Sequence, residues 1–142
     1  MSLFAYLEAG RFSSKYFRKI FGFDPIDEPL LRFAFEEKDV VLMKEFDKKL
    51  LLPSVALLLA MKISSLPQRD KEHKRVKDVC DIFALEWYGG VNPKNASLDK
   101  YLPKSSFANC KKMLADYDFS RAAAQLGHEK EELTRVFDIL LG

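Results

Sequence analysis

Five charged residues in the middle of the chain could together bind an anionic ligand. Lys62 is the charged residue of an otherwise apolar segment, and Lys74 and Lys77 begin the next polar segment, which also carries Asp78 and Asp81. Basic side chains near a helix N-terminus hold phosphate groups, and a carboxylate beside them can meet a metal ion or a hydroxyl group. These five residues are therefore the candidate nucleotide-binding residues of the sequence.

Each of these signals also has a purely structural interpretation. The stem of Lys62 can lie along apolar surface while its ammonium group reaches water. On a helix of 100° per residue, Lys74, Asp78 and Asp81 fall within one sector of about 60°, which is typical of a solvated charged face. Pairs such as Lys74 with Asp78 and Lys77 with Asp81, four residues apart, would then lie on the surface.

Composition limits the remaining possibilities. The chain has 142 residues and a formal net charge of +2, which is enough chain for one core but too little charge to coat an anionic membrane or wrap nucleic acid. The apolar run Leu50 to Met61 contains Pro53 and falls short of the roughly 20 residues of a membrane span. No signal peptide is indicated at the N-terminus, and Cys80 and Cys110 lie in apolar periodic segments, so we expect a single-domain cytoplasmic protein without a membrane partner.

The N-terminal third of the chain predicts short helices followed by strands. Helical spacing over residues 2–21 indicates two short helices, and the alternation of Leu31, Phe33 and Phe35 indicates a strand. A Glu37-Lys38 turn would connect this strand to a partner over Asp39 to Asp47, and Leu50 to Leu52 would add a short third strand before Pro53. We expect this sheet to pack against the helix that follows.

From Ser54 onward the periodicity is helical. Ser54 is the expected N-cap of a buried helix that ends at Pro67, and Asp70 the expected N-cap of a second helix that ends at Gly89 and Gly90. The tail predicts three further helices, marked by Phe107 to Tyr117, Ala122 to Leu126 and Leu133 to Leu140. The fold class is therefore α+β and mostly helical, with a short antiparallel hairpin or three-stranded sheet before a C-terminal helical bundle. We place the organisational boundary at residues 90/91, with 91–142 as a helical extension packed on 1–90.

The central motifs resemble a known family. The order LPSVALLLAMKISSLPQR followed by KRVKDVCDIFAL is similar to the C-terminal half of nucleotidyltransferase-fold proteins of the AbiEii toxin type, within the DNA polymerase β-like superfamily, over about Leu50 to Leu85. The resemblance implies that Lys62 matches the family's helix lysine and that Asp78 and Asp81 match the two acids of its last motif. In the family these positions line the nucleotide-binding cleft.

The sequence departs from the family at the metal centre. The superfamily has an early Gly-Ser turn and then a strand with Asp-x-Asp, whereas this chain has Gly10-Arg11-Phe12-Ser13 and Asp24-Pro25-Ile26-Asp27. Two convergent carboxylates are needed to hold Mg²⁺ against the transferring phosphoryl group, so no catalytic set is complete and the isolated chain is expected to be inactive. The resemblance implies Mg²⁺ and a nucleoside triphosphate only together with an upstream catalytic half or a partner protein that supplies these motifs.

Other chemistries have less support. His73 and His128 lack the spacing of zinc ligands, both cysteines lie in apolar helical segments, and no phosphate-binding glycine loop occurs. Phe119 to Leu141 has the outline of a helix-turn-helix, but its second helix begins with acidic residues that would repel DNA phosphates. An ordinary helical hairpin, in a non-catalytic helical interaction module, is therefore the alternative to the nucleotidyltransferase interpretation.

The resemblance makes one geometric prediction. Only Pro67 to Arg69 separates the two central helices, which should therefore be antiparallel neighbours. At 1.5 Å per residue, Lys62 lies roughly 6 Å and Asp78 roughly 13 Å from the bend. The amine of Lys62 should then reach the carboxylate of Asp78, on a concave surface beside the strands. If Lys62 only snorkels, it should point into open solvent while Asp78 pairs with Lys74.

Overall fold

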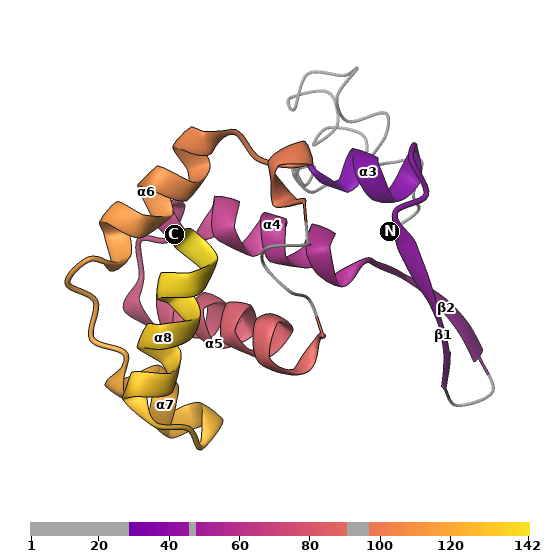
Figure 1. Cartoon of the computed structure of the whole chain (residues 1–142). Helices are drawn as coiled ribbons and strands as arrows, with labels where there is room; N and C mark the ends of the chain where they lie inside the picture. The colour runs from indigo at the N-terminus through magenta and orange to yellow at the C-terminus, as the bar shows by residue number, and fades with distance from the viewer. Residues whose placement is uncertain (1–28, 46–47, 91–96) are drawn as a thin grey trace, which may run out of the picture. The chain divides into compact units, whose positions relative to one another are not determined.

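The computed structural model describes residues 29–45, 48–90 and 97–142, which are mostly helical and include one two-stranded antiparallel hairpin (Figure 1). This confirms the predicted α+β, mostly helical fold class. The helices expected within residues 2–21 lie outside the described part of the chain. The chain divides into two compact units, Met1–Lys38 and Asp39–Gly142, and each is described by itself.

The described element of the first unit is helix α3, Leu31–Phe35, where the alternation of side chains had predicted a strand. The strand prediction is wrong. Neighbouring residues of a strand face opposite sides, whereas Phe33 and Ala34 are both buried. Leucine, arginine and alanine are good helix formers, and Pro29 lies just ahead of the helix, where its carbonyl accepts from the amide of Arg32 at 3.3 Å.

The second unit opens with the hairpin. Strand β1, Val40–Glu45, pairs with β2, Lys48–Pro53, in a register that runs from Val40 opposite Pro53 to Glu45 opposite Lys48. The predicted strand after Asp39 is confirmed, but its partner is the segment expected to be a short third strand. Three apolar residues of the hairpin are exposed: Val41 by 42%, Leu42 by 51% and Leu52 by 38%. We had expected the sheet to pack against the helix that follows, but these residues do not contribute to the helical core.

Two helices follow the hairpin and form the centre of the unit. Helix α4, Val55–Ser65, begins at Ser54 as predicted, since the Ser54 side chain accepts from the amide of Leu57 at 3.2 Å. A 3-10 turn, η1 (Leu66–Gln68), leads to helix α5, Glu72–Tyr88. The N-cap of α5 is Lys71, with extended backbone and no side-chain cap, so the prediction that Asp70 caps this helix is wrong. Asp70 lies one residue too early for its carboxylate to take that position.

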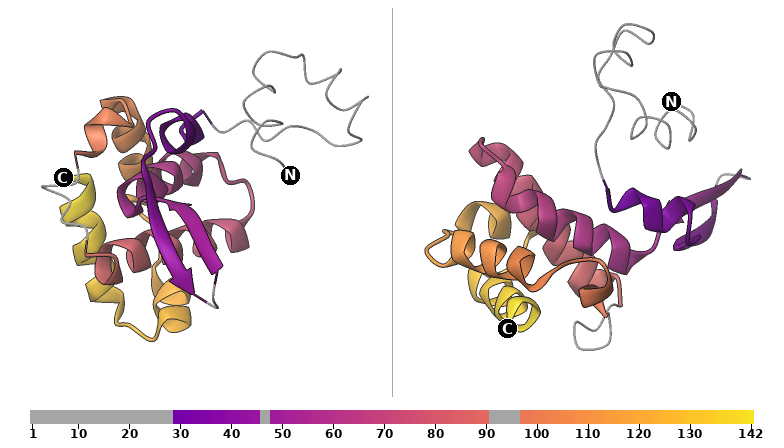
Figure 2. Two further views of the ribbon diagram at one scale, coloured as in Figure 1. Left: turned by 90° about the vertical axis from the view of Figure 1, so that its right-hand side faces the viewer. Right: turned by 90° about the horizontal axis from the view of Figure 1, so that it is seen from above.

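The C-terminal part adds a 3-10 turn and three helices. These are η2 (Leu98–Lys100), α6 (Lys104–Leu114), α7 (Ser120–Leu126) and α8 (Lys130–Leu141), which confirm the three helices predicted for the tail. Gly127 ends α7 with a φ of 69°, a left-handed conformation that glycine adopts without strain. The resulting turn between α7 and α8 is visible at the bottom of the left view of Figure 2.

The core of the second unit is built around α4. This helix packs against α5 and α6, and α5 in turn packs against α7 and α8 (Figures 1 and 2). The side chains of Leu57, Leu59, Ala60 and Ile63 on α4 are fully buried, which fits the nearly all-round apolar sequence of this helix. In the described ranges, no helix has both the length and the apolar character needed to cross a membrane.

Candidate functional site

Helices α4 and α5 are antiparallel neighbours, as predicted from the short connection between them. At one end, a Cβ atom placed on Gly89 after α5 would lie 2.7 Å from Cγ1 of Val55 at the start of α4. At the other end, side chains near the end of α4 contact the first half of α5. Glycine at position 89 therefore permits the close approach of the two helices.

Lys62 of α4 bridges two carboxylates of α5. Its Nζ lies 3.0 Å from Oδ1 of Asp78 and 2.7 Å from Oδ2 of Asp81. This confirms the predicted contact between Lys62 and Asp78. The two distances show that the ammonium group is paired with both carboxylates, while 27% of the Lys62 side chain stays exposed.

Asp78 has two further partners. Its Oδ2 accepts hydrogen bonds from Oγ of Ser65 at 3.1 Å and from Nε of Arg69 at 2.7 Å. Arg75 donates from its Nε to the backbone carbonyl of Arg69 at 2.9 Å and so helps to hold that residue. The Asp78 side chain is only 2% exposed, so the interpretation of its helix face as solvated is wrong at this position.

The charges of this cluster change the acidity of its members. Burial raises the pKa of Asp78, but hydrogen bonds from Arg69 and Lys62 and their charges outweigh burial, and the pKa lies below its ordinary value. Burial lowers the pKa of Lys62, yet its hydrogen bonds to Asp81 and Asp78 leave the pKa raised overall. Both residues are therefore charged at neutral pH, and the cluster is a network of paired ions.

Lys74 and Lys77 are not part of this network. Both lysines are exposed, and in the described part of the chain neither forms an ion pair. The expected surface pairs of Lys74 with Asp78 and of Lys77 with Asp81 are not formed. Both aspartates pair with Lys62 instead. Asp81 is the accessible acid of the cluster, with 36% of its side chain exposed. Of the five candidate residues, the structure thus brings together Lys62, Asp78 and Asp81.

No known family matches the chain. Comparison with protein-family models, curated proteins and solved structures gives no significant similarity. The resemblance to nucleotidyltransferases therefore stays a hypothesis that rests on the motifs between Leu50 and Leu85.

The sequence interpretation missed Ser65 and Arg69 as members of the cluster. Ser65 follows Lys62 by three residues, and Arg69 follows Lys62 by seven. In a continuous α-helix, this spacing would place all three residues on one face. That spacing was the available signal. It carries little weight alone, because serine and arginine near a helix end usually face water.

A second polar cluster joins the end of α5 to the turn before α8. The hydroxyl of Tyr88 lies 2.7 Å from Nε2 of His128, and Nδ1 of His128 lies 3.0 Å from Oε2 of Glu132. The His128 ring also makes edge contacts with the rings of Phe83 and Trp87, at centroid distances of 4.8 and 5.2 Å. The sequence interpretation considered His128 as a zinc ligand and as the first residue of the second helix of a helix-turn-helix, and it missed this arrangement. The four-residue spacing of His128 and Glu132 was the available signal.

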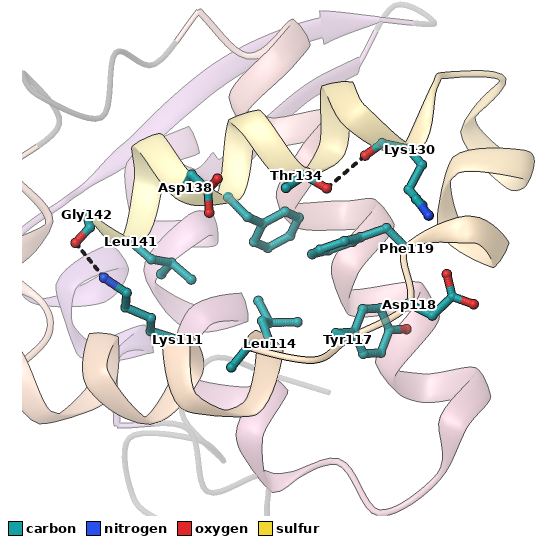
Figure 3. A pocket seen from close by; sticks show the side chains of 12 residues that line it. Lys111, Leu114, Tyr117, Asp118, Phe119, Lys130, Thr134, Asp138, Leu141 and Gly142 are labelled. Atoms are coloured by element: carbon teal, nitrogen blue, oxygen red, sulfur yellow. Dashed lines mark hydrogen bonds between the residues drawn. The ribbon is translucent and has the colours of Figure 1, made fainter.

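A cavity of about 730 Å³ lies between α6 and α8. Figure 3 shows Phe119 and Leu114 pointing into it, with Lys111 and Lys130 near opposite ends. Nζ of Lys111 donates to the carbonyl of Gly142 at 2.7 Å. None of the residues that line this cavity belongs to the Lys62 cluster, so the concave surface predicted beside the strands is not this cavity.

In the described ranges there is no cluster of metal ligands and no activated thiol. No three His, Cys, Asp or Glu side chains are grouped there as metal ligands. Burial raises the pKa of the Cys110 thiol to about 12, and burial and the charge of Asp81 raise the pKa of Cys80. Neither thiol is activated as a nucleophile.

Proposed function

We propose that this chain is the C-terminal, nucleotide-contacting region of a nucleotidyltransferase-like protein. The observation that supports this proposal is the position of the Lys62 amine between the carboxylates of Asp78 and Asp81, at 3.0 and 2.7 Å. In the sequence resemblance to nucleotidyltransferases, these three residues fall on positions that line the family's nucleotide-binding cleft. Their convergence from two different helices is what a shared ligand site requires.

The partly exposed members of the cluster would make the contacts. The side chains of Lys62 and Arg69 are 27% and 36% exposed and present cationic groups suited to phosphate oxygens. Asp81 is accessible and can accept hydrogen bonds from ribose hydroxyl groups. The exposed Lys74 and Lys77 on α5 add local positive charge that attracts a polyphosphate.

Catalysis would need groups beyond this cluster. In the proposal, the two metal-binding carboxylates come from an upstream catalytic half or a partner protein, and they hold the Mg²⁺ that stabilises phosphoryl charge. A cytoplasmic location is part of the same proposal. The complete protein would transfer a nucleotidyl group from a nucleoside triphosphate to an acceptor.

Calorimetric titration of the chain, prepared together with its upstream catalytic half or partner protein, with each of the four ribonucleoside triphosphates tests the proposal. Lys62→Met and the double change Lys74→Ala/Lys77→Ala should each weaken binding by about tenfold, equivalent to about 1.4 kcal/mol. Lys112→Ala is the matched control, because Lys112 is an exposed lysine on α6. Absence of nucleotide binding in the unmodified protein with its complete catalytic half, or equal weakening by Lys112→Ala, would reject the proposal.

The alternative function is a non-catalytic helical interaction module. It is favoured by the hydrogen bonds of Asp78, whose two oxygens already accept from Lys62, Ser65 and Arg69. A buried carboxylate with internal partners of this kind serves to hold α4 against α5. In that case Lys62→Met would lower stability and leave the titrations unchanged.

DNA binding through α7 and α8 has less support. Glu129 and Glu132 form a capping box at the start of α8, and Glu131 lies in the same first turn. Three carboxylates therefore lie at the N-terminus of α8, which is the end that would approach the DNA phosphates and be repelled by them.

A further inference from the structure

Tyr88, His128 and Glu132 have the relative positions of a nucleophile, a general base and an orienting acid. The hydroxyl oxygen of Tyr88 is 2.7 Å from Nε2 of His128, and the opposite ring nitrogen, Nδ1, is 3.0 Å from Oε2 of Glu132. Tyrosine is among the side chains that act as covalent nucleophiles, and this chain of two hydrogen bonds is the usual signature of activation by a base. The three residues come from α5, the turn after α7, and α8.

The hydrogen bonds fix which nitrogen of His128 is the acceptor. The backbone amide of Glu129 and the His128 side chain hydrogen-bond to Glu132 and lower its pKa, so Glu132 is an ionised acceptor. Its partner Nδ1 must therefore carry a proton. In the neutral ring, Nε2 is then unprotonated and accepts from the Tyr88 hydroxyl.

The same contacts hold the base in place. The His128 side chain is only 14% exposed and lies against the rings of Phe83 and Trp87. Glu132 is itself fixed by the amide of Glu129 at 3.0 Å. Tyr88, in contrast, is 68% exposed, so a substrate can reach its hydroxyl oxygen while the base stays covered.

We propose that Tyr88 is a nucleophile that accepts an acyl group from aryl esters. Its oxygen attacks the ester carbonyl carbon and forms a new carbon–oxygen bond, while the phenol proton passes to Nε2 of His128. The bond between the carbonyl carbon and the aryl oxygen breaks, and the aryl oxide leaves and takes up the proton from His128. Water can then hydrolyse the tyrosyl ester: His128 accepts a proton from the attacking water, the bond between the carbonyl carbon and the Tyr88 oxygen breaks, and that oxygen takes the proton back from His128 as the carboxylic acid leaves.

The surroundings of Tyr88 favour an aromatic substrate. Trp87 is 46% exposed and lies against the His128 ring at a centroid distance of 5.2 Å, so an aromatic surface borders the histidine that binds the Tyr88 hydroxyl. An aryl ring can stack there. In the described ranges, the Tyr88 hydroxyl is hydrogen-bonded to His128 and not to a lysine or arginine, so an anionic phosphate ester is less well matched.

Reaction of the full chain with 4-nitrophenyl acetate tests the proposal. The unmodified protein should release a burst of about one equivalent of 4-nitrophenolate, and mass spectrometry should find the acetyl group on Tyr88. N-acetyltyrosinamide is the reference, because its hydroxyl is fully exposed and has no base. We expect acetylation of Tyr88 to be about 100-fold faster than that of the reference, the usual gain from general base catalysis.

Variants separate this role from a structural one. His128→Gln should reduce the rate at Tyr88 to that of the reference, and Tyr88→Phe should abolish the burst. Tyr117 is the internal control, because its hydroxyl donates to Glu72 and not to a histidine. If the contacts are only structural, Tyr88 will react no faster than the reference even in the unmodified chain, and this result would overturn the proposal whether or not the variants fold.

Discussion

Replacement of Asp78 by asparagine should lower the free energy of unfolding by about 3 kcal/mol, because loss of one partner from a buried ion pair is strongly destabilising. The change keeps the shape of the side chain and removes its charge. Asparagine has one acceptor oxygen, whereas both oxygens of Asp78 accept, one from Lys62 and the other from Ser65 and Arg69. The NH₂ group of the asparagine would then face the ammonium group of Lys62 or the guanidinium group of Arg69. We take the lower end of the usual range because Lys62 and Arg69 are 27% and 36% exposed and can regain water.

Urea denaturation followed by far-ultraviolet circular dichroism measures this loss. For a chain of this size, about 3 kcal/mol corresponds to a decrease in Tm of about 10 °C. The effect also depends on pH. The pKa of Asp78 is depressed in the folded protein, so its contribution is complete above the unfolded pKa of about 4 and is lost as pH falls through the folded pKa. The difference between Asp78→Asn and the unmodified chain should therefore shrink below about pH 4.

Asp81→Asn is the matched control. Asp81 is also bound by Lys62 but is 36% exposed, and removal of such a surface pair costs about 0.5 kcal/mol. If Asp78→Asn lost no more stability than Asp81→Asn, the description of Asp78 as a buried, multiply bonded carboxylate would be refuted. A difference between the two variants that persisted unchanged to about pH 2 would refute the role of its charge.

Three further predictions concern single positions at the start of α4 and near the end of α5. Gly89→Ala should lose about 2 kcal/mol in thermal unfolding, since its Cβ would lie 2.2 Å from the carbonyl oxygen of Leu85 and 2.7 Å from Cγ1 of Val55; unchanged stability would contradict the close helix approach. Burial raises the pKa of Glu86 to about 7, so ionisation of Glu86 destabilises the fold as pH rises from about 4. Glu86→Gln should therefore be more stable than the unmodified chain at about pH 8 and similar to it at about pH 4, and the opposite order would be inconsistent with burial. Ser54→Ala should lower the free energy of unfolding in urea by about 1 kcal/mol through loss of the N-cap, whereas Ser54→Asn should retain most of it.

The helices after Ser54 could be predicted from the sequence because their signals are local. Ser54 supplies a cap and Gly127 a left-handed turn, and the apolar residues between them recur at helical spacing. The contact between Lys62 and Asp78 was also predictable. It depends on the short connection between α4 and α5, which leaves few arrangements for two neighbouring helices.

The errors arose where several patterns compete. Three alternating apolar residues, Leu31 to Phe35, fit a strand and also one turn of helix, and a segment of five residues is too short to separate the two. The burial of Asp78 could not be inferred from α5 alone. It depends on Ser65 and Arg69, which lie on the preceding segment and bring their donors to the carboxylate only when the two helices are packed.

The carboxylate of Asp78 also selects one alignment of α4 against α5. The groups that bind it come from Lys62, Ser65 and Arg69, at spacings of three and four residues along the preceding segment. A slide of α4 along α5 by one helical turn, about 5.4 Å, would break all of these hydrogen bonds at once. The leucine, alanine and isoleucine contacts of α4 are not directional and would tolerate such a slide far better. The buried charge of Asp78 thus supplies the alignment specificity that the apolar surface of α4 lacks.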